Sequence, residues 1–327
     1  MKRNMISEAV RRMFFIAPKL PRTVQFEITN QCNLACRMCP RNVLNVKFKH
    51  MELDLFKKLV DKLEGVEEVI LTGWGEPLYH PDIVDMVKYC KKRGFETRFT
   101  TNGILMTENM MDEFIKAGLD EIAFSVETVK PVKDEWGHMN KSALMNIEKL
   151  IKKRGKRDLP RITIQAMLQK GRKQDILDLV RWAGKKGAER VNLGRLYTRF
   201  NPGLEKPSKD EEEDIFYSAE KLGNKLGVQV DCVQYGLFSG PSRFFYKRFK
   251  GLLHRGGKYC LKIYDYIYVN VDGRVTPCCL LPHNVMGDLK KQSLSAIWNG
   301  KVFRKRRENP HPSCKGCDVM KIRRVSK

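Results

Sequence analysis

The chain alternates between two hydrophobic periods over most of its length. Alternating apolar and polar positions predict strands, and apolar positions three and four residues apart predict helices. The predicted strands are 23–29, 67–73, 95–103, 121–127, 161–168 and 190–197. The predicted helices are 53–66, 81–94, 107–117, 142–153, 175–186 and one beginning near 209. Six strand and helix units in succession predict an α/β fold with a parallel, curved sheet and outer helices, which is a barrel or part of one.

The pattern changes after residue 200. Residues 201–255 combine a linker-like stretch with aromatic and basic residues, and we assign them to a connecting region. Residues 264–279 predict a β-hairpin with Asp272-Gly273 in its turn, and residues 293–307 predict a helix. We therefore divide the chain as follows: N-terminal segment 1–22, partial barrel 23–200, connecting region 201–255 and small C-terminal domain 256–327.

The charge of the chain is strongly positive, since 62 Lys and Arg face 38 Asp and Glu among 327 residues, for a formal charge of +24. Such a surface favours anionic partners: a small anionic substrate, a lipid headgroup, nucleic acid or an acidic electron donor. The alternative is a lysine-rich surface with no single partner, as in some thermophilic proteins. Because no long apolar segment or signal peptide is recognisable, we expect a cytoplasmic location.

Three cysteines follow the first predicted strand, at the sheet edge where α/β barrels carry their chemistry. Cys32, Cys36 and Cys39 have the spacing C-x3-C-x2-C. Four thiolates usually complete a [4Fe–4S] cluster, one for each iron, so three leave one iron with an open position. The alternatives are unrelated cysteines, or three zinc ligands completed from elsewhere in the chain.

The segment "CNLACRMC" resembles the signature of the radical S-adenosylmethionine superfamily, whose fold is a partial (β/α)6 barrel. Met38 stands where that family often has an aromatic residue. The resemblance implies a [4Fe–4S] cluster whose open iron binds the amino and carboxylate groups of S-adenosylmethionine. It also implies one-electron cleavage of that sulfonium to a 5′-deoxyadenosyl radical, which removes a hydrogen atom from a substrate.

Other polar positions at the ends of the predicted strands match the same family. "TGWGEP" resembles its motif for the methionine amino group, with Trp74 where a glycine is common. Residues after the third and fourth strands are candidates for holding the ribose, and Arg195 is a candidate for a carboxylate or a substrate anion. Turn capping and simple placement at the barrel rim are the alternatives. The candidate cofactor-binding residues are Gly75, Glu76, Pro77, Asn102, Ser125, Glu127, Gln165 and Arg195.

A second set of cysteines lies near the C-terminus, and its pattern resembles the SPASM/Twitch extension of the same superfamily. The resemblance implies one auxiliary [4Fe–4S] cluster, because only ten residues follow the last of these cysteines. Cys278 and Cys279 compete for one ligand position, and we favour Cys278. Structural zinc is the alternative. The expected ligands are Cys260, Cys278, Cys314 and Cys317, and we expect Cys90 and Cys232 to be buried core thiols.

A cluster with four protein ligands is suited to moving an electron, so we expect oxidation of the substrate radical. The charge favours an anionic small molecule or lipid-like substrate in a biosynthetic or cofactor maturation pathway, with an acidic electron donor such as flavodoxin or ferredoxin. Peptide or protein modification is an alternative, which the short N-terminal segment weakens. RNA modification is another, but no RNA-binding domain is recognisable. A non-catalytic zinc or iron–sulfur protein remains as a different class. Basic aromatic segments 11–15 and 244–255 are candidates for peripheral membrane contact, or for packing on the barrel.

Overall fold

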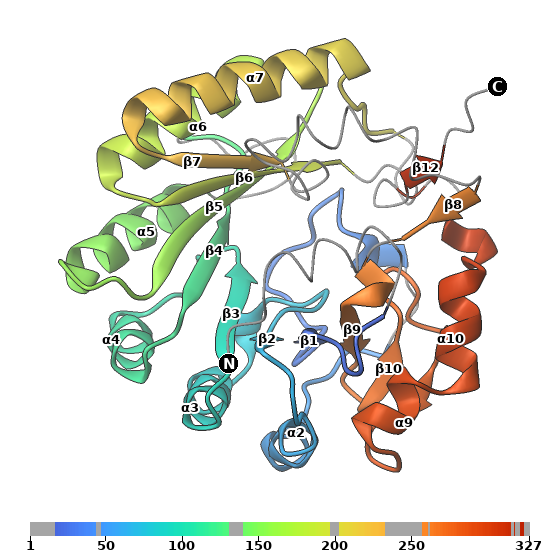
Figure 1. Ribbon diagram of the computed structural model, residues 1–327. Helices are drawn as coiled ribbons and strands as arrows, with labels where there is room; N and C mark the ends of the chain where they lie inside the picture. The colour runs from blue at the N-terminus through green and yellow to red at the C-terminus, as the bar shows by residue number, and fades with distance from the viewer. Residues whose placement is uncertain are drawn as a thin grey trace.

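One ten-stranded sheet organises the chain. The computed structural model describes residues 17–43, 47–130, 140–196, 203–232, 257–260, 262–314, 317 and 321–323. The strand order of the sheet is β11-β10-β9-β1-β2-β3-β4-β5-β6-β7, and β8 and β12 form a separate pair. Figure 1 shows the sheet curving, with helices on its outer side.

The first seven strands pair in parallel and are joined by helices. These strands are β1 (Thr23–Phe26), β2 (Glu68–Ile70), β3 (Glu96–Thr101), β4 (Glu121–Ser125), β5 (Arg161–Leu168), β6 (Arg190–Arg195) and β7 (Gln229–Cys232). The helices are α2 (Leu53–Val60), α3 (Ile83–Lys92), α4 (Glu108–Ala117), α5 (Asn140–Arg154), α6 (Lys173–Lys186) and α7 (Lys209–Leu226). The predicted α/β partial barrel is confirmed. The strand β7 was not predicted, and it lies in the stretch that we had assigned to the connecting region.

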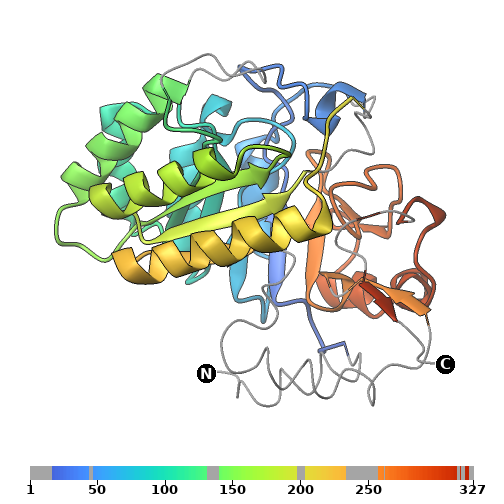
Figure 2. The same cartoon turned by 90° about the horizontal axis from the view of Figure 1, so that it is seen from above.

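The C-terminal elements are shorter. They comprise β8 (Gly257–Tyr259), β9 (Tyr266–Val269), β10 (Arg274–Thr276), β11 (Gly287–Asp288), β12 (Lys321–Arg323), α9 (Leu294–Trp298) and α10 (Lys301–Glu308). The described residues also include the 3-10 turns η1 (Pro40–Val43), η2 (Pro77–Tyr79), η4 (Lys262–Tyr264) and η5 (Pro312–Cys314). Figure 2 shows that α9 and α10 lie on the side of the molecule opposite α4 and α5.

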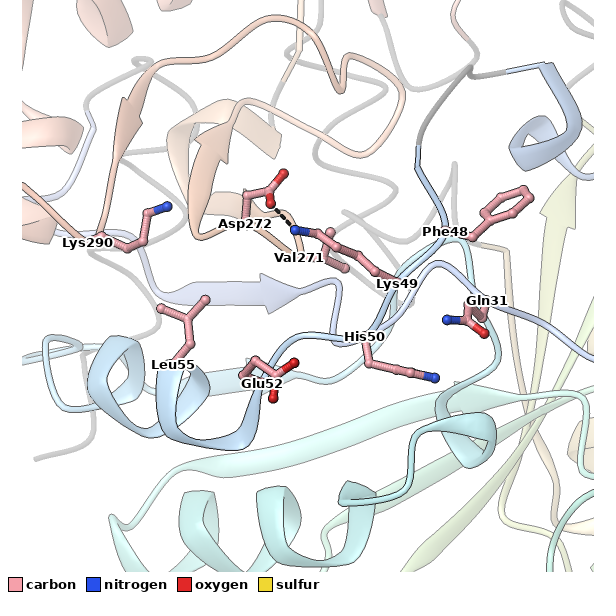
Figure 3. A pocket seen from close by; sticks show the side chains of 9 residues that line it. All are labelled: Gln31, Phe48, Lys49, His50, Glu52, Leu55, Val271, Asp272 and Lys290. Atoms are coloured by element: carbon pink, nitrogen blue, oxygen red, sulfur yellow. Dashed lines mark hydrogen bonds and ion pairs between the residues drawn. The ribbon is translucent and has the colours of Figure 1, made fainter.

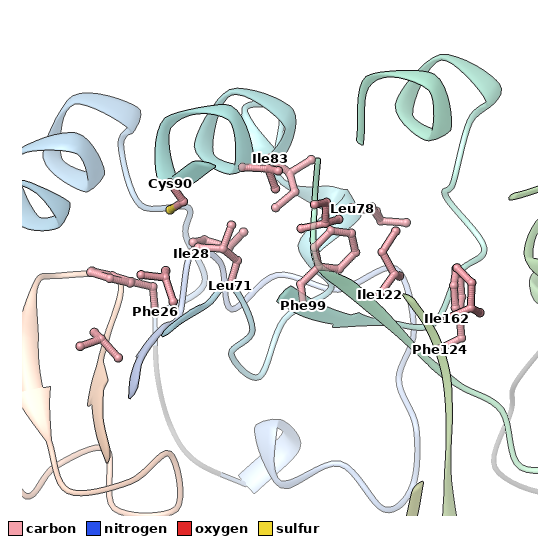
Figure 4. Packing of buried hydrophobic residues seen from close by; sticks show 14 of the residues in the cluster. Phe26, Ile28, Leu71, Leu78, Ile83, Cys90, Phe99, Ile122, Phe124 and Ile162 are labelled. Carbon is pink, nitrogen blue, oxygen red and sulfur yellow. The ribbon is translucent and has the colours of Figure 1, made fainter. Parts of the chain in front are cut away.

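The two faces of the barrel sheet differ in polarity, because successive side chains of a strand point to opposite faces. On the outer face, Phe26, Phe99 and Phe124 are almost fully buried against the helices. Figure 4 shows this layer together with Cys90 of α3. Cys90 is buried as predicted, and burial raises the pKa of its thiol to about 12. The side chain of Cys232 lies outside the described residues.

The C-terminal hairpin continues the barrel sheet. Strand β9 pairs in parallel with β1, with Thr23 opposite Tyr266 and Phe26 opposite Val269. Strand β10 then returns antiparallel to β9, and the predicted turn at Asp272-Gly273 is present, with Gly273 at a φ of 80°. Glycine suits this left-handed conformation because it has no Cβ. The residues that follow the hairpin are therefore placed beside β1.

The helix predicted over residues 293–307 is two helices, α9 and α10. The break lies at Gly300, where a Cβ would come 2.8 Å from the carbonyl oxygen of Ala296. Both helices are anchored at Trp298, whose indole N–H donates to the carbonyl oxygen of Pro18 at 2.8 Å. The guanidinium of Arg307 lies 3.9 Å above the Trp298 ring. These contacts fix the C-terminal helices to the chain segment that enters β1.

The membrane contact that we considered for the basic aromatic segments stays a prediction. The segments 11–15 and 244–255, which we considered for membrane contact, lie outside the described residues. Among the residues that are described, none of the helices combines the length and apolar character needed to span a bilayer.

A charged network closes the N-terminal end of the barrel interior. The carboxylate of Glu68 accepts from the Thr23 hydroxyl at 2.7 Å and forms an ion pair with Arg98. Burial alone would raise the pKa of Glu68, but Arg98 and the Thr23 hydrogen bond outweigh it and lower this pKa below its usual value. The ionised form is therefore the one that stabilises the fold.

We predict that Glu68→Gln lowers the free energy of unfolding by roughly 1–3 kcal/mol near neutral pH, because Arg98 loses its charged partner. Since the folded pKa is depressed, the stabilisation is present above the unfolded pKa of about 4.5 and is lost as the pH falls through the folded value. The free energies of unfolding of the unmodified protein and of Glu68→Gln should therefore converge at low pH. Urea denaturation of the two proteins from pH 3 to pH 7 measures this difference. Glu67→Gln, at an exposed ion pair with Arg22, is the control. An effect of Glu68→Gln that is equal at all pH values would contradict the assignment.

Candidate functional site

The cysteine loop begins directly after β1 and is fixed at its base by the chain segment that precedes α2. Asn30 donates its side-chain amide to the carbonyl of Lys47 at 2.9 Å and accepts from the amide of Lys49 at 2.7 Å. Within the loop, the amide of Cys39 donates to the carbonyl of Cys36 at 3.0 Å. The structure thus brings Cys32, Cys36 and Cys39 into one short, half-buried loop at the carboxyl end of β1.

The electrostatics of this loop favour bound metal over bare thiolates. Burial raises the pKa of Cys32 to about 11, and burial also raises the pKa of Cys39. Thiols in such surroundings become thiolates when a metal ion supplies positive charge. Coordination of a metal therefore fits these three thiols.

The loop after β2 is joined to the cysteine loop through backbone groups. The amide of Gly75 donates to the carbonyl of Thr29 at 3.2 Å, and the amide of Glu76 donates to the carbonyl of Gln31 at 2.8 Å. A Cβ at Gly75 would lie 2.4 Å from the Gln31 carbonyl oxygen. Only glycine permits this close approach, so contact with the cysteine loop explains the second glycine of "GWGEP", which is Gly75.

The carboxylate of Glu76 points into the protein. It is 3% exposed and accepts from the Thr101 hydroxyl at 2.5 Å, the Asn102 amide at 2.8 Å and the Leu78 amide at 3.0 Å. Burial raises the pKa of Glu76, although these donors act in the opposite direction. The side chain thus fixes the start of the loop after β3, and its predicted contact with a ligand ammonium stays a prediction. Pro77, which follows it, is buried at the start of η2.

Asn102 connects the third strand to the cysteine loop. Its side-chain amide donates to the side-chain oxygen of Asn33 at 2.9 Å, and its own side-chain oxygen accepts from the Ile104 amide at 3.0 Å. Loops from three neighbouring strands are therefore interlocked around the cysteines. The ribose contact that we expected of Asn102 remains a prediction.

Ser125 and Gln165 lie side by side on neighbouring strands, and Asn192 is opposite Gln165 on the next strand. All three are half-buried on the inner face of the sheet. Glu127, by contrast, is 5% exposed and accepts from the amide of Met167 at 2.8 Å, which ties the end of β4 to β5. Ser125 and Gln165 therefore lie on the inner face of the barrel sheet, and their contact with a ligand stays a prediction.

Arg195 at the end of β6 is paired within the chain. Its guanidinium donates to the carboxylate of Glu212 on α7, with Nε 2.7 Å from each carboxylate oxygen. No sequence pattern indicated this partner, which lies on a helix 17 positions later in the chain. A contact of Arg195 with a ligand carboxylate would have to share or displace Glu212, so that role stays a prediction.

Met38 faces the far side of the barrel mouth. It packs against Leu196, just after β6, and Leu204, both of which are buried. The cysteine loop therefore reaches across the barrel from β1 towards β6. An apolar contact of this kind suits methionine, whose side chain adapts to irregular gaps.

All five C-terminal cysteines border one apolar cavity. Cys278 interacts electrostatically with Cys260 and Cys314, whereas Cys279 lies near Lys262 and Glu27. Both cysteines line the cavity, so the choice of Cys278 over Cys279 as a ligand stays a prediction. Within the described part of the chain, no group of three or more His, Cys, Asp or Glu side chains is arranged to hold a single metal ion. The cavity is lined by Cys260, Lys262, Ile263, Pro277, Cys278, Cys279, Leu280, Leu281, Arg306, Pro310, Cys314 and Cys317.

Three residues that the sequence did not single out for a role connect the two cysteine sites. The indole N–H of Trp74 donates to the carbonyl of Cys279 at 3.1 Å. The carboxylate of Glu27 accepts from the Tyr268 hydroxyl at 2.9 Å and from the Trp74 amide at 3.5 Å. Burial raises the pKa of Glu27. The alternation of apolar and polar residues in the predicted strand 23–29 could have pointed to Glu27, because it places this side chain on the inner face of the sheet.

A second cavity, of about 440 Å³, lies between the cysteine loop and the C-terminal hairpin (Figure 3). Lys49 crosses from the loop side to form an ion pair with Asp272 in the hairpin turn. This pair adds a side-chain link between the two parts of the chain. The cavity is lined by Gln31, Phe48, Lys49, His50, Glu52, Leu55, Val271, Asp272 and Lys290.

Two family models match the chain. The model described as Radical SAM superfamily matches residues 26–183, and the one described as an iron–sulfur cluster-binding domain, SPASM, matches residues 260–318. The first begins in β1 and the second spans the cavity with five cysteines. Together they cover about two thirds of the chain.

Sequence similarity to known proteins extends along nearly the whole chain. A "tungsten-containing aldehyde ferredoxin oxidoreductase cofactor-modifying protein" of Pyrococcus furiosus is 26% identical, over 90% of this chain and 86% of that protein. A PqqA peptide cyclase of Gluconobacter oxydans is 26% identical, over 92% of this chain and 84% of that protein. The crystal structure of Streptococcus suis SuiB bound to S-adenosylmethionine has a TM-score of 0.72 at 14% identity, and covers 98% of this chain and 77% of that one. At this low identity, the similarity to the SuiB structure shows a shared fold and nothing more.

We predict that Cys278→Ala lowers the iron content after anaerobic reconstitution by up to about four irons per chain, because the auxiliary cluster loses one of its four proposed thiolates. Cys279→Ala, the matched neighbour, should keep the iron content of the unmodified protein. Iron and labile sulfide analysis measures both. Loss of iron from the Cys279 variant with retention in the Cys278 variant would reverse the ligand assignment.

Proposed function

Because the chain belongs to the radical SAM superfamily of enzymes and carries a SPASM domain near its C-terminus, we propose that it reductively cleaves S-adenosylmethionine and oxidises an organic substrate. When bound, the cluster and S-adenosylmethionine supply a 5′-deoxyadenosyl radical that removes a substrate hydrogen atom. The observation that carries this proposal is the interlocking of the cysteine loop with the loops after β2 and β3. That arrangement holds the loop of the three thiols together with Gly75, Glu76 and Asn102.

Each part of the site has a proposed role. Cys32, Cys36 and Cys39 hold the catalytic cluster, and the backbone around Gly75 offers acceptors for the methionine amino group. The remaining side chains position the cofactor from the loops and from the inner face of the sheet, namely Glu76, Pro77, Asn102, Ser125, Glu127, Gln165 and Arg195. Glu76 acts through Asn102, since its own oxygens are occupied by protein donors.

The C-terminal cavity supports an oxidative outcome. We propose that Cys260, Cys278, Cys314 and Cys317 would hold an auxiliary cluster, which would supply a one-electron acceptor for oxidation of the substrate. Glu27, Tyr268 and Trp74 occupy the space between the two sites, and Tyr268 is 1% exposed. These side chains exclude water from the region where a reactive radical would otherwise be quenched.

A cationic cavity supports an anionic substrate. It has a volume of about 490 Å³ and borders the cysteine loop through Arg37, which lies between Cys36 and Cys39. Three cationic side chains and one carboxylate line it, and two of the cations are paired within the chain, Lys170 with Glu205 at 2.7 Å and Arg172 with Asp175 at 2.9 Å. Guanidinium groups bind carboxylates with two parallel hydrogen bonds. We propose that this cavity receives a carboxylate of the substrate. The lining residues are Arg37, Gln169, Lys170, Arg172, Gly203, Leu204 and Glu205.

Peptide modification is the second candidate function. The similarity to a protein named PqqA peptide cyclase favours it, and the similarity to a cofactor-modifying protein favours a small molecule about as well. A peptide with an acidic side chain would satisfy the same cavity. The common element of both candidates is a carboxylate on the substrate.

The proposed activity is tested by replacing Cys32, Cys36 and Cys39 together with alanine. Under anaerobic reduction with dithionite, the unmodified protein should form 5′-deoxyadenosine and methionine, and the triple variant should form neither above background. Cys90→Ala, at a buried thiol of the core, is the control and should keep the activity if it folds. Cleavage that persists in the triple variant would contradict the proposal.

We predict that Arg37→Gln raises KM for a carboxylate-bearing substrate by roughly tenfold, the effect of losing one charge-assisted hydrogen bond, while kcat changes little. Candidate acidic peptides and small carboxylic acids are first screened for stimulation of 5′-deoxyadenosine formation, each beside its amide analogue. Lys47→Gln, an exposed change outside the cavity, is the control. Equal stimulation of 5′-deoxyadenosine formation by the acids and by their amide analogues would contradict the proposal that the substrate carries a carboxylate.

A further inference from the structure

Trp74 forms a direct hydrogen bond between the loop after β2 and the C-terminal cysteines. Its indole N–H donates to the carbonyl oxygen of Cys279 at 3.1 Å. The two residues belong to separate family matches, since Trp74 lies in the Radical SAM match and Cys279 in the SPASM match. Strands β2 and β9 lie on either side of β1, as Figure 1 shows, which brings these two parts of the chain within reach of one another.

The backbone of Trp74 is held on both sides, so its half-buried ring keeps one orientation. The Trp74 amide donates to the carboxylate of Glu27 at 3.5 Å, and Glu27 also accepts from the Tyr268 hydroxyl at 2.9 Å. The next amide, that of Gly75, donates to the carbonyl of Thr29 at 3.2 Å. The indole therefore approaches Cys279 from a fixed position.

The peptide group that accepts from Trp74 also carries an amide that reaches the cysteine sulfurs. The carbonyl of Cys279 and the N–H of Leu280 are the two ends of one planar peptide group. The Leu280 amide donates to the thiols of Cys278 and Cys279. The turn that permits this is closed by the Leu281 amide, which donates to the carbonyl of Cys278 at 3.2 Å. Hydrogen bonds thus connect the indole N–H to the cysteine sulfurs through a single peptide group.

Hydrogen bonds in such a chain strengthen one another. A carbonyl that accepts a hydrogen bond polarises its peptide group, so the N–H at the other end becomes a better donor. Hydrogen bonds to the cysteine sulfurs are among the factors that set the reduction potential of an iron–sulfur cluster. A donor favours the more negative state of its acceptor, which here is the reduced state. Loss of the indole N–H should therefore lower the reduction potential.

Trp74 is set apart from the other described tryptophans. The indole N–H of Trp298 donates to the carbonyl of Pro18, and Trp182 lies on the outer helix α6. Trp74 also stands where a glycine is common in the family motif, and a glycine side chain has no donor. The link to Cys279 is therefore a feature of this chain that the shared motif does not supply.

We propose that Trp74 is a positioning residue that raises the reduction potential of the auxiliary site by polarising the peptide group between Cys279 and Leu280. The inference rests on the proposed function, in which this site supplies a one-electron acceptor. In that step the acceptor gains one electron and the substrate radical loses it, and the hydrogen bonds of Trp74 transfer no proton. The role is the same whether Cys278 or Cys279 is the ligand, because the Leu280 amide donates to both thiols.

The test compares Trp74→Phe, which keeps an aromatic ring and loses the N–H, with the matched control Trp182→Phe. Both changes are made in the full chain with Cys32, Cys36 and Cys39 replaced by Ala, so that only the auxiliary site is loaded. After anaerobic reconstitution, a redox titration followed by electron paramagnetic resonance measures the midpoint potential. At a fixed potential, Trp74→Phe should lower the ratio of reduced to oxidised cluster at least threefold, a downward shift of about 28 mV at about 59 mV per tenfold change for one electron. Trp182→Phe should leave the ratio unchanged.

The absence of a shift in Trp74→Phe, an upward shift, or an equal shift in the control would overturn the proposal. Iron and labile sulfide analysis separates an effect on the potential from an effect on assembly, because Trp74→Phe should keep about four irons per chain in this background. Loss of that iron would also overturn the proposal, since the hydrogen bond would then hold the site together.

Failure of the proposed function is a separate result. Absence of S-adenosylmethionine cleavage by the unmodified protein would refute that function, whereas the titration needs no S-adenosylmethionine and would still decide the role of Trp74. Absence of an iron–sulfur signal from the auxiliary site before Trp74 is changed would overturn the auxiliary cluster and the role of Trp74 together.

Discussion

The arrangement of the molecule depends on the position of β1 between two parallel neighbours. Pairing with β2 places the cysteine loop against the loop that carries Gly75. Pairing with β9 places the hairpin, and the cysteines that follow it, on the other side of the same strand. Because hydrogen bonding in the sheet fixes the register, the two cysteine sites cannot move independently of one another. Their relationship is set by the backbone before any metal is bound.

The side chains between the two sites follow from that pairing. Alternation along β1 directs Gln25 and Glu27 to the inner face, and alternation along β9 directs Tyr266 and Tyr268 to meet them. Each tyrosine hydroxyl donates to its partner, at 2.8 Å for Tyr266 with Gln25 and 2.9 Å for Tyr268 with Glu27. Buried polar groups in such a network are satisfied within the protein, which keeps the interior closed to water. A radical reaction needs this kind of enclosure.

Local sequence patterns predicted the parts of the structure that depend on local interactions. The period-two strands, the amphipathic helices, the turn at Gly273 and the loop with Cys32, Cys36 and Cys39 all follow from residues near one another in the chain. The sequence did not predict that β9 joins β1, because that pairing connects residues about 240 positions apart. It also missed β7, a strand of four residues, which is too short to show alternation clearly.

The binding partners of side chains were harder to predict from the sequence than the places of those side chains in the fold. Glu76 and Arg195 were both placed correctly at strand ends, yet their charged groups bind Thr101, Asn102 and Glu212 of this chain. Such partners depend on how separate elements pack, and no pattern in the local sequence encodes them. The break between α9 and α10 was also missed; a Cβ at Gly300 would come 2.8 Å from the carbonyl oxygen of Ala296, four positions earlier in the chain.

The central claim is that the loop after β1 holds a cluster with one open iron for S-adenosylmethionine. The most direct measurement is the electron paramagnetic resonance spectrum of the reduced protein in which Cys314 and Cys317 are changed to Ala, so that only the loop site is loaded. We predict a single [4Fe–4S] signal whose g-values shift when S-adenosylmethionine is added, because the open iron gains ligands. A signal that is unchanged by S-adenosylmethionine would contradict the claim, and so would the absence of a cluster signal in a protein that remains folded.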